Sequence, residues 1–128
     1  MGTPGSYLLL MKLPAPRTLI AGRLGSFRFP AGWYVYTGSA LGGVEQRVAR
    51  HLRPSDVRRW HLDYLKAEAT IRGTFIFPGP ERPECDLAAE LLSRPGAAVP
   101  APRFGASDCR CPSHLIHFET RPSLPYDE

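Results

Sequence analysis

The stretch YLLLMKL, residues 7–13, decides the fold, because it is an apolar run of strand length that stops at Pro14 and Pro16. Such a run, bounded by residues that break regular structure, predicts a buried β-strand. It is far shorter than the ~20 apolar residues that span a membrane. A second stretch, WYVYT at residues 33–37, is aromatic and β-branched and predicts another strand.

A glycine-rich break at residues 38–43 follows the second strand and precedes a predicted helix over residues 44–52. Val44, Val48 and Leu52 recur at helical spacing, so we expect them to form the buried stripe of this helix. The chain therefore changes from strand to helix across a short glycine segment.

The rest of the chain continues this alternation. We expect further strands over residues 17–22, 25–28, 69–77 and 114–119, and further helices over residues 60–67 and 84–92. The order is a β-meander followed by helix, helix, strand, helix and strand, which predicts an α/β (α+β) fold. We expect a small, mostly antiparallel β-sheet flanked by helices, in one domain over residues 1–128 with a flexible tail at 121–128.

The composition fits a globular protein with a basic surface. The chain has 128 residues, is 43% hydrophobic and carries a net charge of +4. Of the 16 basic residues only Lys12 and Lys66 are lysines. Arginine binds phosphate through two parallel hydrogen bonds better than lysine does, so a polyanionic partner is one explanation for the excess of arginine. GC-rich coding, which also favours arginine, is the other. The start lacks a secretory signal and the three cysteines are an odd number, so we expect a cytoplasmic protein.

Two short triplets and a helix arginine carry a family resemblance. Gly5-Ser6-Tyr7 opens the first strand, Tyr36-Thr37-Gly38 ends a later one, and Arg47 and His51 follow in the next helix. In order and spacing these residues resemble the GIY-YIG nuclease superfamily. The middle residue of each triplet differs from the superfamily pattern.

Three later segments resemble one uncharacterised branch of that superfamily. They are HLDYL at residues 61–65, Glu84-Cys85, and FGASDCRC at residues 104–111. Members of this branch occur alone or fused to endonuclease III-like DNA repair enzymes. The resemblance implies a GIY-YIG-like fold and a DNA repair protein as a partner.

The resemblance also implies a catalytic set, which is Tyr7, Tyr36, Arg47, His51 and Glu84. Arg47 would bind the scissile phosphate, and Tyr7, with Tyr36 or His51, would activate water. A glutamate on a later helix would hold Mg²⁺ or Mn²⁺, and Glu84 is favoured over Glu90 for that role. The alternatives are core packing for the tyrosines and His51, a solvated helix position for Arg47, and a helix-dipole role for Glu84.

A larger set of residues would contact nucleic acid. Arginines beside aromatic residues can hold phosphates, while the alternative is a solvated basic loop. The predicted nucleic-acid-binding residues are Gly38, Arg50, Arg53, Arg58, Arg59, His61 and Arg110.

The cysteines form a second candidate site. Cys85, Cys109, Cys111 and His114 offer the thiolate and imidazole ligands that suit Zn²⁺. The alternative is that free cysteines simply pack the last strand onto the third helix.

Three functions therefore remain open at the level of sequence. The first is a metal-dependent endonuclease that hydrolyses DNA phosphodiester bonds, in DNA repair. The second is a nucleic-acid-binding module without effective chemistry. The third is a zinc-stabilised interaction domain. The sequence leaves the DNA structure that is recognised and the oligomeric state undetermined.

Overall fold

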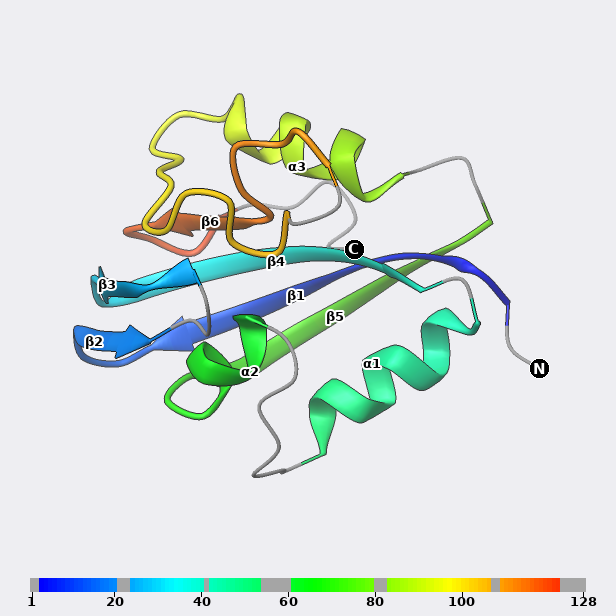
Figure 1. Ribbon diagram of the computed structural model, residues 1–128, viewed down its shortest axis with the longest axis horizontal. Helices are drawn as coiled ribbons and strands as arrows, with labels where there is room; N and C mark the ends of the chain where they lie inside the picture. The colour runs from blue at the N-terminus through cyan, green and yellow to red at the C-terminus, as the bar shows by residue number, and fades with distance from the viewer. Residues whose placement is uncertain are drawn as a thin grey trace.

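Strand β1 (Gly5–Leu13) is the centre of the main sheet in the computed structural model of the protein (Figure 1). It lies between β4 (Gly32–Ala40) and β5 (Thr70–Pro78), and β6 (Leu115–Phe118) pairs with the other edge of β4. All three pairings are antiparallel, and the strand order is β5-β1-β4-β6. The most apolar strand thus takes a place where both of its faces and both of its edges are covered.

The structure describes residues 3–20, 24–40, 42–53, 61–79, 83–106 and 109–122. The predicted DNA contacts Arg58 and Arg59, the side chain of His61 and most of the predicted tail, residues 123–128, lie outside this part. In these ranges no helix is long and apolar enough to cross a membrane.

The expected meander is wrong in one respect. Within the described residues, strands β2 (Arg17–Ile20) and β3 (Ser26–Phe29) pair with each other and form a separate two-stranded sheet. Both edges of β1 are already occupied, and the prolines after it interrupt regular pairing before β2 begins.

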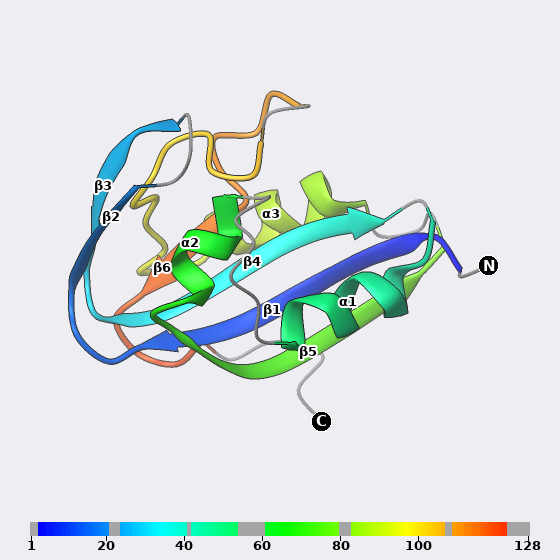
Figure 2. The same ribbon diagram turned by 60° about the horizontal axis from the view of Figure 1, so that its bottom comes forward.

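Alternation along β1 divides the core into two clusters. Tyr7, Leu9 and Met11 face one side of the sheet, and Leu8 and Leu10 face the other. The first side is covered by α1 (Val44–Leu52) and α2 (His61–Lys66), and the second by α3 (Glu84–Leu92). Figure 2 shows α1 and α2 in front of the sheet and α3 behind it. The antiparallel sheet flanked by helices confirms the predicted fold class.

Helix α1 differs from its predicted amphipathic pattern at its last turn. Val44 and Val48 are buried as expected, but Leu52 is 53% exposed and its neighbour His51 is only 2% exposed. Helix α1 has nine residues, and consecutive residues point about 100° apart around its axis. A small rotation of the helix about this axis is therefore enough to bury His51 in place of Leu52. This exchange directs a titratable ring, instead of a leucine, into the interior beside β1.

Candidate functional site

Tyr7 lies on β1 with its hydroxyl inside the protein. The hydroxyl is 2.8 Å from Nε2 of His51 and also receives a hydrogen bond from the Arg47 side chain. Burial raises the pKa of Tyr7 to about 12, against the opposing effect of the Arg47 charge. The phenol is therefore neutral near pH 7, and its orientation is set by residues of α1.

His51 is held in its neutral form. Burial, with the positive charge of Lys66 as the next contribution, lowers the pKa of His51 to about 4. A neutral ring that carries its proton on Nδ1 accepts the Tyr7 hydroxyl proton at Nε2. Tyr36 completes the cluster, with its ring centroid 6.4 Å from those of Tyr7 and His51. We call Tyr7, Tyr36, Arg47 and His51 the tyrosine cluster.

Each tyrosine of the cluster rests on a glycine. Gly38 pairs with Tyr7 across the strands, and a Cβ at Gly38 would lie 2.4 Å from the Tyr7 hydroxyl oxygen. A Cβ at Gly105 would lie 2.9 Å from the ring of Tyr36, and Gly105 has a φ of 69°. Gly38, predicted as a nucleic-acid contact, thus provides the space for the Tyr7 ring. No pattern in the sequence indicates the same role for Gly105.

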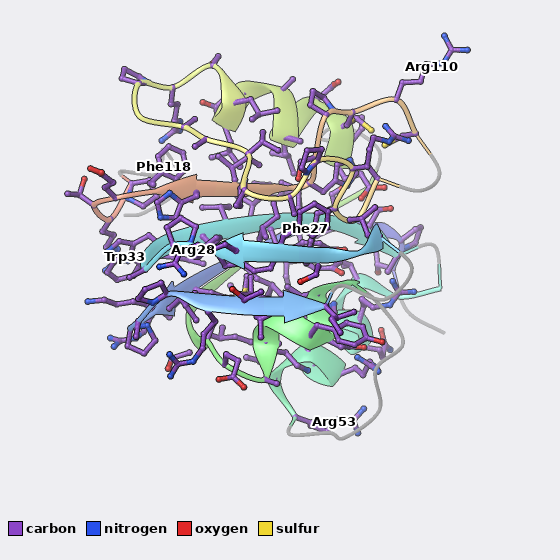
Figure 3. The ribbon with its side chains drawn as sticks, turned by 60° about the vertical axis from the view of Figure 1, so that its left-hand side comes forward. Phe27, Arg28, Trp33, Arg53, Arg110 and Phe118 are labelled. Carbon is purple, nitrogen blue, oxygen red and sulfur yellow. The ribbon has the colours of Figure 1, made fainter. Side chains whose placement is uncertain are left out.

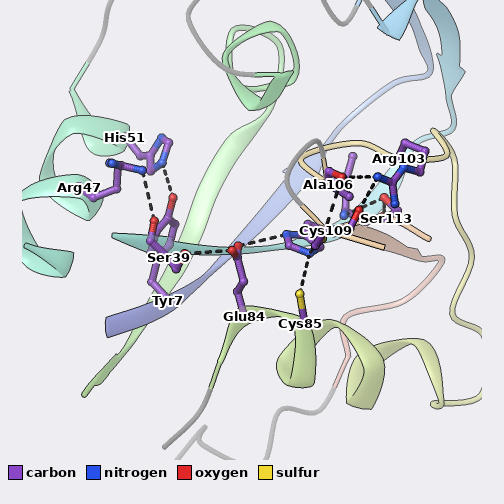
Figure 4. Close-up of polar contacts among 12 residues, drawn as sticks. Tyr7, Ser39, Arg47, His51, Glu84, Cys85, Arg103, Ala106, Cys109 and Ser113 are labelled. Carbon is purple, nitrogen blue, oxygen red and sulfur yellow. Dashed lines mark hydrogen bonds and ion pairs between the residues drawn. The ribbon is translucent and has the colours of Figure 1, made fainter. Parts of the chain in front are cut away.

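Ser39 connects the tyrosine cluster to Glu84, and it was missed in the sequence. Nη1 of Arg47 donates to the Ser39 carbonyl at 3.3 Å, and the Ser39 hydroxyl donates to Oε1 of Glu84 at 2.9 Å. Figure 4 shows the resulting path from α1, across the end of β4, to the start of α3. Glu90, the competing candidate, is exposed and pairs with Arg94 at 2.8 Å. Of the two glutamates, Glu84 is therefore the one near the predicted catalytic residues.

On its other side, Glu84 contacts a group of cysteine and histidine side chains. The ligand atoms of Cys85, Cys109, Cys111 and His114 all lie within 4.8 Å of one another. Nε2 of His114 is 3.4 Å from the sulfur of Cys109 and 3.8 Å from that of Cys85. We call these four residues the cysteine cluster, and this group could bind a metal ion.

Hydrogen bonds among the thiols of the cysteine cluster shift their pKa values in different directions. A hydrogen bond with the Cys111 thiol, together with burial, raises the pKa of Cys85 to about 12. Burial would also raise the pKa of Cys109, but hydrogen bonds from Cys111 and Cys85 and the nearby His114 lower it overall. Cys109 is thus the thiol that most readily supplies a thiolate, the form that binds metals.

Arg103 holds the loop that carries two of these thiols, and it was also missed. Its guanidinium donates to the carbonyl oxygens of Ala106, Cys109 and Cys111. Its backbone N–H donates to the Pro112 carbonyl at 2.6 Å. No sequence pattern marks this role, because it depends on the path of the loop.

The described residues of the predicted DNA-binding set do not form one patch. Arg50 donates to the buried carboxylate of Asp63 at 3.1 Å and joins α1 to α2. Arg53 ends α1, and its side chain and that of Arg110 lie on opposite sides of the molecule in Figure 3. The structure brings together the catalytic candidates and the four zinc candidates, but not these arginines.

The fold and the two clusters define a small α+β domain with a group of cysteine and histidine side chains able to bind a metal ion. Residues 6–126 match the family described as Domain of unknown function DUF123, and the chain belongs to that family. No curated protein and no solved structure matches the chain.

Proposed function

We propose that the protein is an endonuclease that hydrolyses DNA phosphodiester bonds with Mg²⁺ or Mn²⁺, and that it acts in DNA repair with a repair protein as partner. The observation that carries this proposal is the convergence of Tyr7, Tyr36, Arg47, His51 and Glu84 at one end of the sheet. These residues come from β1, β4, α1 and α3, and the GIY-YIG resemblance assigns each of them a catalytic role. The family match is silent on activity.

The surroundings of Glu84 fit a hard divalent cation. Its side chain is 29% exposed, and each carboxylate oxygen keeps a lone pair beyond the contacts with Ser39 and His114. One carboxylate with water completes the shell that Mg²⁺ prefers. Thr37 adds a buried hydroxyl, without a hydrogen-bond partner among the described residues, on the same face of β4 as Ser39. A cation at Glu84 would neutralise charge on the phosphoryl and leaving oxygens.

The chain's own groups suit the remaining steps. Arg47 offers a charged fork for the phosphate, beside the Tyr7 hydroxyl. Because Tyr7 is neutral, it acts as a relay: its oxygen takes a proton from the attacking water while its own proton passes to Nε2 of His51. The neutral His51 is the acceptor that this relay needs.

Cleavage of nicked, flapped and branched DNA tests the proposal. With Mg²⁺ or Mn²⁺ present, Arg47→Ala and Glu84→Gln should each slow cleavage about 100-fold or more. Glu90→Gln is the matched control, since Glu90 lies on the same helix and faces solvent and Arg94. Cleavage that persists unchanged in both variants contradicts the assignment. Salt-sensitive binding without cleavage, lost when Arg58 and Arg59 are replaced, supports the binding module instead.

The cysteine cluster favours a second candidate, a zinc-stabilised interaction domain. Three thiols and an imidazole form a ligand set typical of structural Zn²⁺. We propose that Zn²⁺ is the ion for this group, and its presence is compatible with the nuclease. Elemental analysis together with the cleavage assay distinguishes the two candidates. One zinc per chain without cleavage of any DNA supports the interaction domain, and a folded protein without zinc contradicts it.

A further inference from the structure

We infer that Glu84 serves both clusters: it orients His114 as a ligand of the cysteine cluster, and that histidine in turn positions the Glu84 carboxylate for the tyrosine cluster. This inference rests, for its second half, on the proposed nuclease function. Its first half concerns metal binding alone and stands without any nuclease activity.

The two oxygens of Glu84 face different partners. Oε1 accepts from the Ser39 hydroxyl at 2.9 Å, on the side of the tyrosine cluster. Oε2 is 3.1 Å from Nδ1 of His114, at ion-pair distance but out of line for a straight hydrogen bond. One carboxylate thus bridges the end of β4 and the residue that precedes β6.

The two nitrogens of His114 are divided in the same way. The ring is buried, with Nδ1 at Glu84 and Nε2 between the sulfurs of Cys109 and Cys85. A histidine that binds a metal through Nε2 must keep its proton on Nδ1, and a carboxylate there fixes the tautomer and the ring orientation. Glu84 is in the place of that carboxylate.

The distances from the His114 nitrogen to two of the sulfurs agree with a tetrahedral site. Zinc bonds of about 2.3 Å to sulfur and 2.0 Å to nitrogen place the ligand atoms about 3.5–3.8 Å apart. The His114 nitrogen is 3.4 Å and 3.8 Å from two of the sulfurs. The ring therefore needs little movement to become a ligand while Nδ1 stays at Glu84.

The backbone strengthens the connection. Glu84 and Cys85 are consecutive residues at the start of α3, after Pro83. A ligand bond at Cys85 fixes the first turn of the helix, and with it the position from which the Glu84 side chain extends. The carboxylate is consequently held twice, through its own helix and through His114.

Glu84→Gln tests the first half, with Glu90→Gln as the matched control. The glutamine keeps the size of the side chain but loses the charge that faces Nδ1. We expect zinc affinity, measured by competition with a chromophoric chelator, to fall about 10-fold or more in Glu84→Gln and to stay unchanged in Glu90→Gln. The absorption bands of Co²⁺ bound in place of zinc should shift only in Glu84→Gln. Equal zinc affinities in the two variants overturn the inference.

His114→Cys tests the second half, because it keeps a soft ligand but removes the nitrogen that faces Glu84. Zinc content should remain at one ion, while Mn²⁺ bound outside the cysteine cluster, measured by electron paramagnetic resonance, should weaken about 10-fold. Unchanged Mn²⁺ affinity with zinc retained overturns the positioning of Glu84. Absence of DNA cleavage in the wild-type protein refutes the proposed nuclease alone, because both metal measurements still decide the inference.

Discussion

The tyrosine cluster and the cysteine cluster meet at Glu84 but are built in different ways. The first consists of side chains on regular strands and a helix, buried in the core, with each tyrosine resting on a glycine. The second takes one thiol from α3 and the rest from a loop that backbone hydrogen bonds and Arg103 hold. Packing and the hydrogen bonds of Tyr7, His51 and Arg47 maintain the first cluster. The second brings together three half-buried thiols and a histidine that could bind a metal ion.

Of the changes that test this comparison, loss of the proposed ion should reduce the stability of the protein most. Under the proposed zinc site, Cys109→Ser removes the thiol whose pKa is lowered and should abolish zinc binding. At a zinc concentration a thousandfold above Kd, the lost stabilisation is about 4 kcal/mol. Thermal unfolding should show a fall in Tm on the order of 10 °C.

Asp86→Asn is the matched control, because Asp86 is exposed in the same turn of α3 as Cys85. It should keep both the zinc and the Tm of the wild type. A Cys109→Ser protein with unchanged Tm would mean that the cysteine cluster, like the tyrosine cluster, is held by packing.

His51 gives the second largest effect, through the dependence of stability on pH. The unfolded histidine binds a proton near pH 6.5, but in the folded protein the pKa of His51 is lowered to about 4. Between these values the unfolded state binds more protons, so stability falls as the pH drops from 6.5 to 4, by about 3 kcal/mol. Denaturant unfolding at several pH values measures this slope.

His51→Gln should remove the His51 share of the slope. The difference in unfolding free energy between wild type and variant should therefore be larger at pH 7 than at pH 4. Comparing the two proteins cancels the effect of acid on the cysteine cluster, which is the same in both. A difference that does not change with pH would show that His51 has the same pKa in the folded and unfolded states, and would contradict the lowered pKa.

Much of this architecture could be predicted from the sequence because it depends on local patterns. The apolar run in β1 and the break at residues 38–43 locate the strands and α1 within a few residues. The exchange of Leu52 for His51 on the buried face could not be predicted, since a short helix settles its rotation only against the sheet. Glycine spacing suggests a backbone need, but only the fold shows which ring each glycine meets.

The sites divide in a similar way. Tyr7, Arg47 and Glu84 came from a resemblance of ordered motifs, and the structure brings them near one another. Ser39 and Arg103 act through contacts between distant segments, and a serine or an arginine alone carries no pattern that marks such a role. The zinc candidates were predicted from ligand type, although their separation in sequence is not that of a standard zinc motif.

Gly38→Ala should produce an effect of intermediate size on the tyrosine cluster. The new methyl group would overlap the Tyr7 ring, which is buried and hydrogen-bonded and cannot simply turn away. We expect a loss of about 2 kcal/mol in unfolding free energy. Gly42→Ala is the control, because a Cβ there has no atom within 4 Å. Equal stability of the two variants would contradict the conclusion that Gly38 provides the space for the Tyr7 ring.

Removal of a single tyrosine hydroxyl should have the smallest effect on stability, and it tests whether the Tyr7 hydroxyl has a catalytic role or only a structural one. Tyr7→Phe removes the hydroxyl that contacts His51 and Arg47, and Tyr34→Phe removes the hydroxyl that donates to the Pro30 carbonyl. Each substitution should cost on the order of 1 kcal/mol. The rings stay, so both variants should fold and keep zinc. Under the proposed function the two should then differ: Tyr7→Phe interrupts the proton relay and slows DNA cleavage about 100-fold, while Tyr34→Phe leaves the rate unchanged. A common loss of stability with a common rate would place Tyr7 with Tyr34, as a core residue whose hydroxyl only satisfies its neighbour.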